Sequence, residues 1–174
     1  DQSFVKHVLD RQSVEFFSKN LNKVPDVMSR QLIWRTFYDM VKDSKITSQK
    51  YVEIFLNNIA QETFDSIFEK QIDLISMSIS NFTPHKYREK LNDCVFYFTL
   101  WLLKTAPKEN ANRLVVLRNK LVEFASSQEA KKVLVDWYNE SFQPLKEHKM
   151  TVGQQWSTIV KSFTLKDWTV EQKE

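Results

Sequence analysis

The chain has 174 residues, which suits one domain with a sizeable core, and 42% of them are hydrophobic, which excludes a largely disordered protein. Its 25 basic and 22 acidic residues leave a net charge of +3, too small to indicate nucleic acid, and no apolar run is long enough to cross a bilayer. The sequence holds a single glycine, Gly153. Because tight hairpins and phosphate-binding loops depend on glycine, its scarcity excludes a β-rich domain and the Gly-rich nucleotide and serine-hydrolase motifs, and predicts an all-α fold.

Residues 3–9 alternate with the two-residue period of a short strand. A lone strand forms no sheet, so we interpret residues 1–12 as the remnant of a preceding β domain or as a linker. Residues 13–174 are then a helical domain that is truncated at its C-terminal end. We expect the chain to be truncated at both ends.

From Ser13 onward the apolar residues recur with the spacing of an α-helix, and we expect about eight helices. Their expected ranges are 14–22, 25–41, 46–60, 62–81, 83–104, 107–125, 126–139 and 151–163. The expected starts are marked by N-cap residues, by proline in the first turn or by capping-box spacing, at Ser13, Pro25 with Asp26, Thr47, Thr83 with Pro84, Pro107, Ser126 with Glu129, and Thr151 with Gln154. Helices of these lengths with short links predict antiparallel pairs stacked side by side, an irregular HEAT-like α-solenoid.

The fifth expected helix is apolar nearly all round after Cys94, so we expect it at the centre of the fold. The structural core is predicted to include Trp34, Phe37, Met40, Phe98 and Trp101. Cys94 has apolar neighbours, so we interpret it as a buried structural thiol rather than a nucleophile. As the only cysteine it allows no internal disulfide, which favours the cytoplasm over secretion.

Residue patterns for catalysis and metal binding are absent from the sequence. The three histidines, His7, His85 and His148, are far apart, and there is no HExxH. We therefore expect no catalytic residue, no metal ligand and no cofactor in this chain.

Charge is uneven along the chain. Residues 43–80 carry three basic and six acidic side chains, and residues 86–120 carry eight basic and three acidic ones. Such a basic stretch attracts phosphates or carboxylates, or it complements a neighbouring acidic surface; both interpretations stay open.

A family pattern lies between residues 24 and 62. Its members are Asp26, Ser29, Arg30, Trp34, Met40, Val41, Asp43 and Tyr51, with Glu62 after the next helix. The segment resembles the C-terminal helical domain of the aminopeptidase N-type zinc aminopeptidases (gluzincins). Residues 4–9, followed by Asp10 and Ser13, resemble the last strand of the family's preceding β-sandwich running into the helical domain. Residues 151–160, with Trp156, resemble a late helix of that domain.

This resemblance implies a non-catalytic domain that arches over a catalytic domain, closes a chamber and limits which peptides enter. The family's HExxH and Gly-x-Met-Glu-Asn motifs are absent here, because both belong to an upstream catalytic domain, where zinc is expected. The implied partners are that upstream domain and peptide substrates, with neither nucleic acid nor membrane. In such a chamber we expect Arg113 and Arg118 to bind a peptide's C-terminal carboxylate, because a guanidinium pairs with it bidentately.

Two other functions remain open. One is a freestanding helical-repeat scaffold that binds a protein or peptide in a groove. The other is a non-enzymatic homologue of the same architecture. An HExxH upstream of Asp1 in the parent protein would separate the aminopeptidase from the non-enzymatic homologue.

Overall fold

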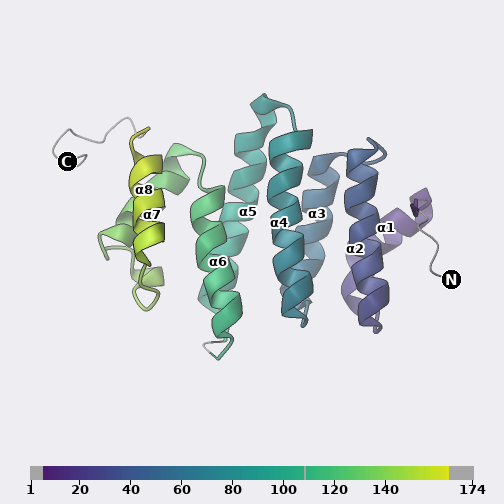
Figure 1. Ribbon diagram of the computed structural model, residues 1–174, viewed down its shortest axis with the longest axis horizontal. Helices are drawn as coiled ribbons and strands as arrows, with labels where there is room; N and C mark the ends of the chain where they lie inside the picture. Colours follow the sequence, from purple (N-terminus) through teal and green to yellow (C-terminus); the bar gives the residue numbers. More distant parts are fainter. Residues whose placement is uncertain (1–5, 108, 165–174) are drawn as a thin grey trace. The chain divides into compact units, whose positions relative to one another are not determined.

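A computed structural model describes residues 6–107 and 109–164, and within them the chain is all-α (Figure 1). The all-α prediction is confirmed, and no strand occurs in the described ranges. The eight helices are α1 (Arg11–Asn20), α2 (Val27–Lys42), α3 (Ser48–Asn58), α4 (Asp65–Phe82), α5 (His85–Thr105), α6 (Ala111–Phe124), α7 (Gln128–Tyr138) and α8 (Val152–Ser162). Three short 3-10 turns join them, at Leu21–Lys23, Ile59–Gln61 and Gln143–Leu145.

The N-terminal residues differ from the sequence prediction. Residues 6–9 form no strand, and residues 3–5 of the expected strand lie outside the described residues. Strand hydrogen bonds need a neighbouring strand, and the described chain offers none. Lys6 instead pairs with Asp43 at 2.5 Å. The assignment of residues 1–12 to a preceding β domain stays a prediction.

Helix starts follow side-chain capping, with two corrections. The first helix begins at Arg11, because the Asp10 carboxylate accepts the Ser13 amide at 2.9 Å; the expected N-cap, Ser13, lies inside the helix. The seventh helix is capped by Ser127 rather than Ser126, since the Ser127 hydroxyl accepts the Ala130 amide at 3.1 Å.

Three other starts show how well the local signals work. Asp26 and Thr47, expected near the starts of the second and third helices, are the N-caps of α2 and α3, so Pro25 precedes α2 instead of lying in its first turn. Thr151 forms the expected capping box with Gln154 at α8. The sixth helix begins at Ala111, with Asn110 as its N-cap, four residues after the expected start at Pro107.

Left-handed backbone occurs at two residues that are not glycine. Ser44 has φ 58° after α2, and Glu140 has φ 56° after α7. At each place a Schellman pattern ends the helix. The Lys45 amide donates to the Met40 backbone carbonyl at 2.8 Å, and the Ser141 amide donates to the Asp136 backbone carbonyl at 2.9 Å. Glycine usually fills this position, yet Gly153 lies in the first turn of α8 and has no positive φ.

Contacts divide the chain into two compact units, one up to Leu91 and one from Asn92. The boundary falls inside α5, a continuous helix of 21 residues. In the first unit α1 packs on α3 and α2 packs on α4, while α3 also contacts α2 and α4 (Figure 1). These contacts form two layers of side-by-side helices, as in an α-solenoid.

The core of the first unit combines aromatic packing with satisfied polar groups. Trp34, Phe37 and Met40 of α2 are buried there. The ring of Trp34 meets that of Tyr51 edge-on at 6.4 Å, and the Tyr51 hydroxyl donates to Gln71 Oε1 at 2.8 Å. Burial raises the pKa of the Tyr51 hydroxyl well above its usual value.

The second unit is built from the rest of α5 with α6, α7 and α8. Its core includes Val95, Phe96, Leu103, Leu117, Leu121, Leu134 and Trp137. Polar contacts hold α8 to α6: Gln154 Nε2 donates to Asn119 Oδ1 at 2.7 Å, and Lys161 Nζ donates to the carbonyls of Glu123 and Ala125 at 2.7 and 3.0 Å. Burial lowers the pKa of Lys161, whose ammonium caps the end of α6.

One face of α5 departs from the expected core. Val95 and Phe96 are buried, but Cys94 and Tyr97 are exposed and Trp101 is 50% exposed. Phe98 is half-buried and lies 5.6 Å from the Trp101 ring, centroid to centroid. Cys94, Tyr97 and Trp101 are spaced i, i+3, i+7, so they share the side of the helix opposite its buried residues. The predictions of a buried Cys94 and a core Trp101 were therefore wrong.

Candidate functional site

The two arginines proposed to bind a peptide carboxylate, Arg113 and Arg118, both lie on α6 and are half-buried. Five residues place them about 140° apart around a helix. They therefore flank the buried stripe of Leu114, Leu117 and Leu121 on opposite sides. The Nε of Arg118 donates to the Leu114 carbonyl at 3.2 Å. The two arginines thus begin from different sides of α6 rather than from one face.

Other basic side chains of the 86–120 stretch make local contacts. Lys86 Nζ lies 4.7 Å from the Tyr87 ring centroid, Arg88 Nε donates to the Thr83 carbonyl at 2.8 Å, and Lys120 pairs with Glu123 at 2.5 Å. Lys108 lies outside the described residues.

Acidic side chains of residues 43–80 pair with partners outside the basic stretch. Glu53 binds Lys50 at 2.9 Å, and Glu62 binds Arg30 at 3.0 Å. These two carboxylates are therefore neutralised by Lys50 and Arg30 and not by the basic residues between positions 86 and 120.

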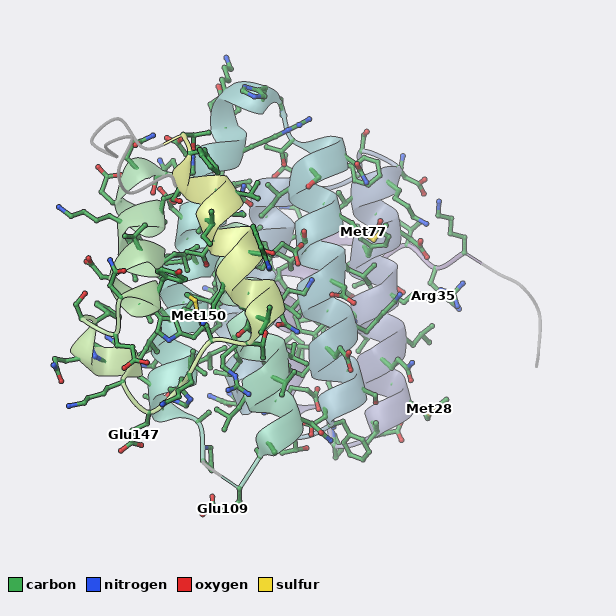
Figure 2. The ribbon with its side chains drawn as sticks, turned by 60° about the vertical axis from the view of Figure 1, so that its left-hand side comes forward. Met28, Arg35, Met77, Glu109, Glu147 and Met150 are labelled. Carbon is green, nitrogen blue, oxygen red and sulfur yellow. The ribbon has the colours of Figure 1, made fainter. Side chains whose placement is uncertain are left out.

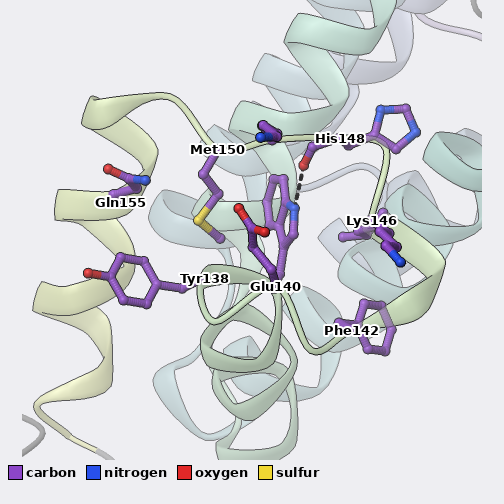
Figure 3. A pocket seen from close by; sticks show the side chains of 10 residues that line it. Tyr138, Glu140, Phe142, Lys146, His148, Met150 and Gln155 are labelled. Carbon is purple, nitrogen blue, oxygen red and sulfur yellow. Dashed lines mark hydrogen bonds between the residues drawn. The ribbon is translucent and has the colours of Figure 1, made fainter.

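A small pocket opens in the second unit, between the end of α7, the segment that follows it and the start of α8 (Figure 3). Its volume is about 80 Å³. The lining residues are Trp137, Tyr138, Glu140, Phe142, Leu145, Lys146, His148, Lys149, Met150 and Gln155. From the sequence, this segment was noted only for His148, one of three histidines that are far apart.

Trp137 organises this pocket. Its indole Nε1 donates to the His148 carbonyl at 2.5 Å and so ties the connecting segment to α7. Lys104 Nζ lies 5.8 Å from the ring centroid of Phe142 and brings α5 to the same segment. Glu140, which has the left-handed conformation, also lines the pocket (Figure 3).

Lys146 and Lys149 contribute two basic residues to the lining of the pocket, and Glu140 contributes one acidic residue. A volume of about 80 Å³ holds several waters, because a cavity needs roughly 10–15 Å³ to hold one. The signal that the sequence offered was the group of aromatic and basic residues between Trp137 and Met150.

The described ranges were searched for metal-binding groups and for membrane-spanning helices. No group of three His, Cys, Asp or Glu side chains there is placed to hold a metal ion. The described helices include none with the length and apolarity to span a membrane. The absence of zinc from this chain stays a prediction.

Comparison with known proteins finds a distant likeness to a bacterial aminopeptidase. Over 91 residues, 52% of this chain, the sequence is 24% identical to aminopeptidase N of Streptomyces lividans. The match spans 11% of the length of that protein. No protein-family model matches the chain. The chain is therefore a helical segment distantly similar to part of aminopeptidase N.

Proposed function

We propose that this chain is a non-catalytic helical domain of a zinc aminopeptidase, which caps the catalytic chamber and limits the access of peptides. The observation that carries the proposal is the likeness to aminopeptidase N over 91 residues. An all-α domain whose described residues offer no metal-binding group suits a capping role better than a catalytic one. The zinc and the catalytic residues then lie in an upstream domain of the longer protein, which is also this domain's partner.

The test of the capping role uses the complete parent protein. Its sequence upstream of Asp1 should contain an HExxH, and metal analysis should find about one zinc in that domain and none in the present chain. One zinc bound to the present chain, with peptide hydrolysis that a chelator abolishes, would overturn the proposal.

Arg113 and Arg118 bear on the peptide-binding part of the proposal. Because they lie on opposite sides of the α6 stripe, we propose that each attracts a peptide carboxylate separately, and most strongly at low salt. In the complete enzyme, Arg113→Gln and Arg118→Gln should each raise KM for long peptides and leave a single-residue chromogenic substrate unchanged. Lys90→Gln, at an exposed position on α5, is the control. Equal effects on both substrates would mean that the arginines are structural.

The second candidate function is a scaffold that binds a protein or peptide. The exposed face of Cys94, Tyr97 and Trp101 favours it, since aromatic residues are enriched at binding surfaces. A parent protein without HExxH, in which Trp101→Ala abolishes capture of a peptide ligand, would support this function instead.

A further inference from the structure

Positive charge gathers at one end of the first unit. The connection between α2 and α3 lies there beside the connection between α4 and α5, since Ser48 Oγ at the start of α3 donates to the Ser78 carbonyl near the end of α4 at 3.3 Å. The α4–α5 connection stands out at the upper edge of this unit in Figure 1. We call residues 42–47 and 82–90, which form these two connections and the helix ends beside them, the basic end.

The basic end carries an excess of cations. Its charged side chains are Lys42, Asp43, Lys45, Lys86, Arg88, Glu89 and Lys90. Lys6 pairs with Asp43 at 2.5 Å. Lys42 pairs with Asp39 at 2.6 Å. These pairs neutralise one another and leave four cations against one carboxylate, Glu89, so three positive charges are in excess.

The opposite end of the same unit has the reverse balance. It lies around the connections that lead into α2 and α4, residues 21–26 and 59–65. These residues carry one cation, Lys23, and three carboxylates, Asp26, Glu62 and Asp65. Glu62 is neutralised by Arg30, so two carboxylates remain against one lysine. The net charge of the chain is only +3, but its uneven distribution creates a local field, and the basic end therefore suits an anionic partner.

Two aromatic side chains are exposed among these cations. Phe82 is 41% exposed and Tyr87 is 52% exposed. The Lys86 ammonium lies 4.7 Å from the centroid of the Tyr87 ring. The ring of Tyr38 meets that of Phe82 edge-on at 6.4 Å, and the Lys42 ammonium lies 5.3 Å from the Tyr38 ring centroid. Aromatic rings accompanied by lysines are typical of protein surfaces that enter the headgroup region of a bilayer.

The arrangement of the rings favours a bilayer over a nucleic acid. Binding of single strands relies on ring faces on which bases stack. Here the Lys86 ammonium already lies over the Tyr87 ring, and Phe82 packs against Tyr38. The α4–α5 connection also projects from its unit (Figure 1), so its side chains can reach a flat surface together.

We propose that the basic end binds the surface of a membrane that contains anionic phospholipids, with Phe82 and Tyr87 in the headgroup region and Lys45 and Lys86 at the phosphates. The attachment is peripheral and independent of the proposed capping function. It departs from the family resemblance, which implies no membrane partner. Each basic side chain near an anionic bilayer strengthens binding roughly fivefold, so an excess of three gives a reversible, salt-dependent attachment.

The first experiment measures binding of the full protein to sedimented vesicles of phosphatidylcholine, with and without about 30% phosphatidylserine. We expect binding to the anionic vesicles to be at least about tenfold stronger than to the neutral ones, and to weaken as the salt concentration rises above ~0.1 M. Equal binding to the two kinds of vesicle would overturn the proposal.

Charge variants test whether the basic end is responsible. Lys45→Gln combined with Lys86→Gln should weaken binding to the anionic vesicles at least about tenfold. The matched control, Lys19→Gln combined with Lys70→Gln, removes the same charge at exposed positions of α1 and α4 away from the basic end. It should weaken binding by less than about twofold, because salt screens distant charges. Equal losses in the two double variants would contradict the assignment.

The second experiment locates the contact with a polarity-sensitive fluorophore. In a Cys94→Ser background, Tyr87→Cys and Phe64→Cys each carry the label at a position whose aromatic side chain is exposed, the first at the basic end and the second at the opposite end. Anionic vesicles should raise the emission of the label at position 87 at least about threefold and leave that at position 64 unchanged. Equal responses would mean adsorption without orientation and would refute the proposal.

Other anionic partners are separated by titration at the same salt concentration. Single-stranded DNA and polyglutamate should each bind the full protein at least about tenfold more weakly than the anionic vesicles do. Tighter binding to DNA would assign the basic end to a nucleic acid, and tighter binding to polyglutamate would assign it to an acidic protein segment. Either result would overturn the membrane assignment.

Discussion

Arg30 and Glu62, thirty-two residues apart, form a buried bidentate ion pair. Arg30 Nε and Nη2 each donate to a Glu62 carboxylate oxygen at 3.0 Å, and Nη1 donates to the carbonyls of Val24 and Pro25. The Phe64 amide also donates to the Glu62 carboxylate, at 3.0 Å from Oε1. One guanidinium and one carboxylate thus fix the start of α2 to the connection that leads into α4.

Breaking this pair is expected to cost about 3–5 kcal/mol of unfolding free energy, because each single substitution leaves a buried charge without its partner. Arg30→Met and Glu62→Gln should both show this loss in urea unfolding, and Arg30→Lys should not rescue it, since an ammonium lacks the planar fork. Arg35→Ala is the matched control on the same helix, because Arg35 is exposed at the side of α2 (Figure 2) and lies 3.8 Å from Asp39. A loss below about 1 kcal/mol for Arg30→Met would contradict the assignment.

Two tryptophans provide a second comparison. Trp34 is 1% exposed and Trp101 is 50% exposed. Trp34→Ala should destabilise the protein by roughly 3–5 kcal/mol, because it opens a cavity in a packed core. Trp101→Ala should change the unfolding free energy by less than about 1 kcal/mol, as surface substitutions do. Thermal midpoints that fall equally in both variants would show that Trp101 is covered in solution.

Ser44 offers a stabilising substitution. A residue with a Cβ at φ 58° carries a strain of roughly 1–2 kcal/mol that glycine avoids, while glycine costs about 0.5–1 kcal/mol of chain entropy. Ser44→Gly should therefore stabilise the fold by up to ~1 kcal/mol. Ser80→Gly, at an exposed position inside α4, should instead destabilise it, since helical backbone gains nothing from glycine there. A lowered unfolding midpoint for Ser44→Gly would refute the strain argument.

Tyr51 should make the fold sensitive to alkali. Its folded-state pKa lies above that of the unfolded chain, so above pH 10 the folded state holds the proton that the unfolded state releases. The contribution of the Tyr51 hydroxyl to the free energy of unfolding is therefore fully present below pH 10. It is lost as the pH rises above 10, by at most about 1.4 kcal/mol per pH unit. Tyr51→Phe should start less stable, because Gln71 loses a hydrogen bond, and the difference from the wild type should shrink above pH 10.

The control for this pH series is Tyr87→Phe, at an exposed position. Its difference from the wild type should stay constant between pH 8 and 11 in guanidinium unfolding. A Tyr51→Phe difference that also stays constant would contradict the burial of that hydroxyl.

Local signals explain why the helices were predictable from the sequence. Glycine scarcity excluded a β-rich fold, and side chains such as Asp26 and Thr151 mark helix starts because each accepts a backbone amide three residues on. Asp10 was missed because the strand-like alternation before it hid the stronger cap. Trp101 was counted as a core residue because it lies in an apolar run, yet it is exposed. Apolar side chains are also exposed elsewhere, as Met28 is at the outer edge of α2 (Figure 2).

The candidate site depended on long-range geometry that sequence spacing does not contain. The pocket exists because the Trp137 indole reaches the His148 carbonyl across a chain reversal, and a backbone acceptor leaves no trace in residue identity. The basic stretch illustrates the opposite problem: Arg113 and Arg118 are close in sequence, but helix geometry places them on two sides of α6.

The continuity of α5 decides how this protein can be taken apart. Proteases and insertions act at exposed loops, whereas Leu91 and Asn92 lie inside an uninterrupted helix. A cut in the connection before α5 would remove the part of α5 up to Leu91 from the first unit. A cut in the connection after α5 would remove the part of α5 from Asn92 onward from the second unit. Neither unit is thus a module that can be excised or transplanted alone. In limited digestion we therefore expect the two units to remain in one fragment or to be degraded together. A recombinant fragment should likewise include both units.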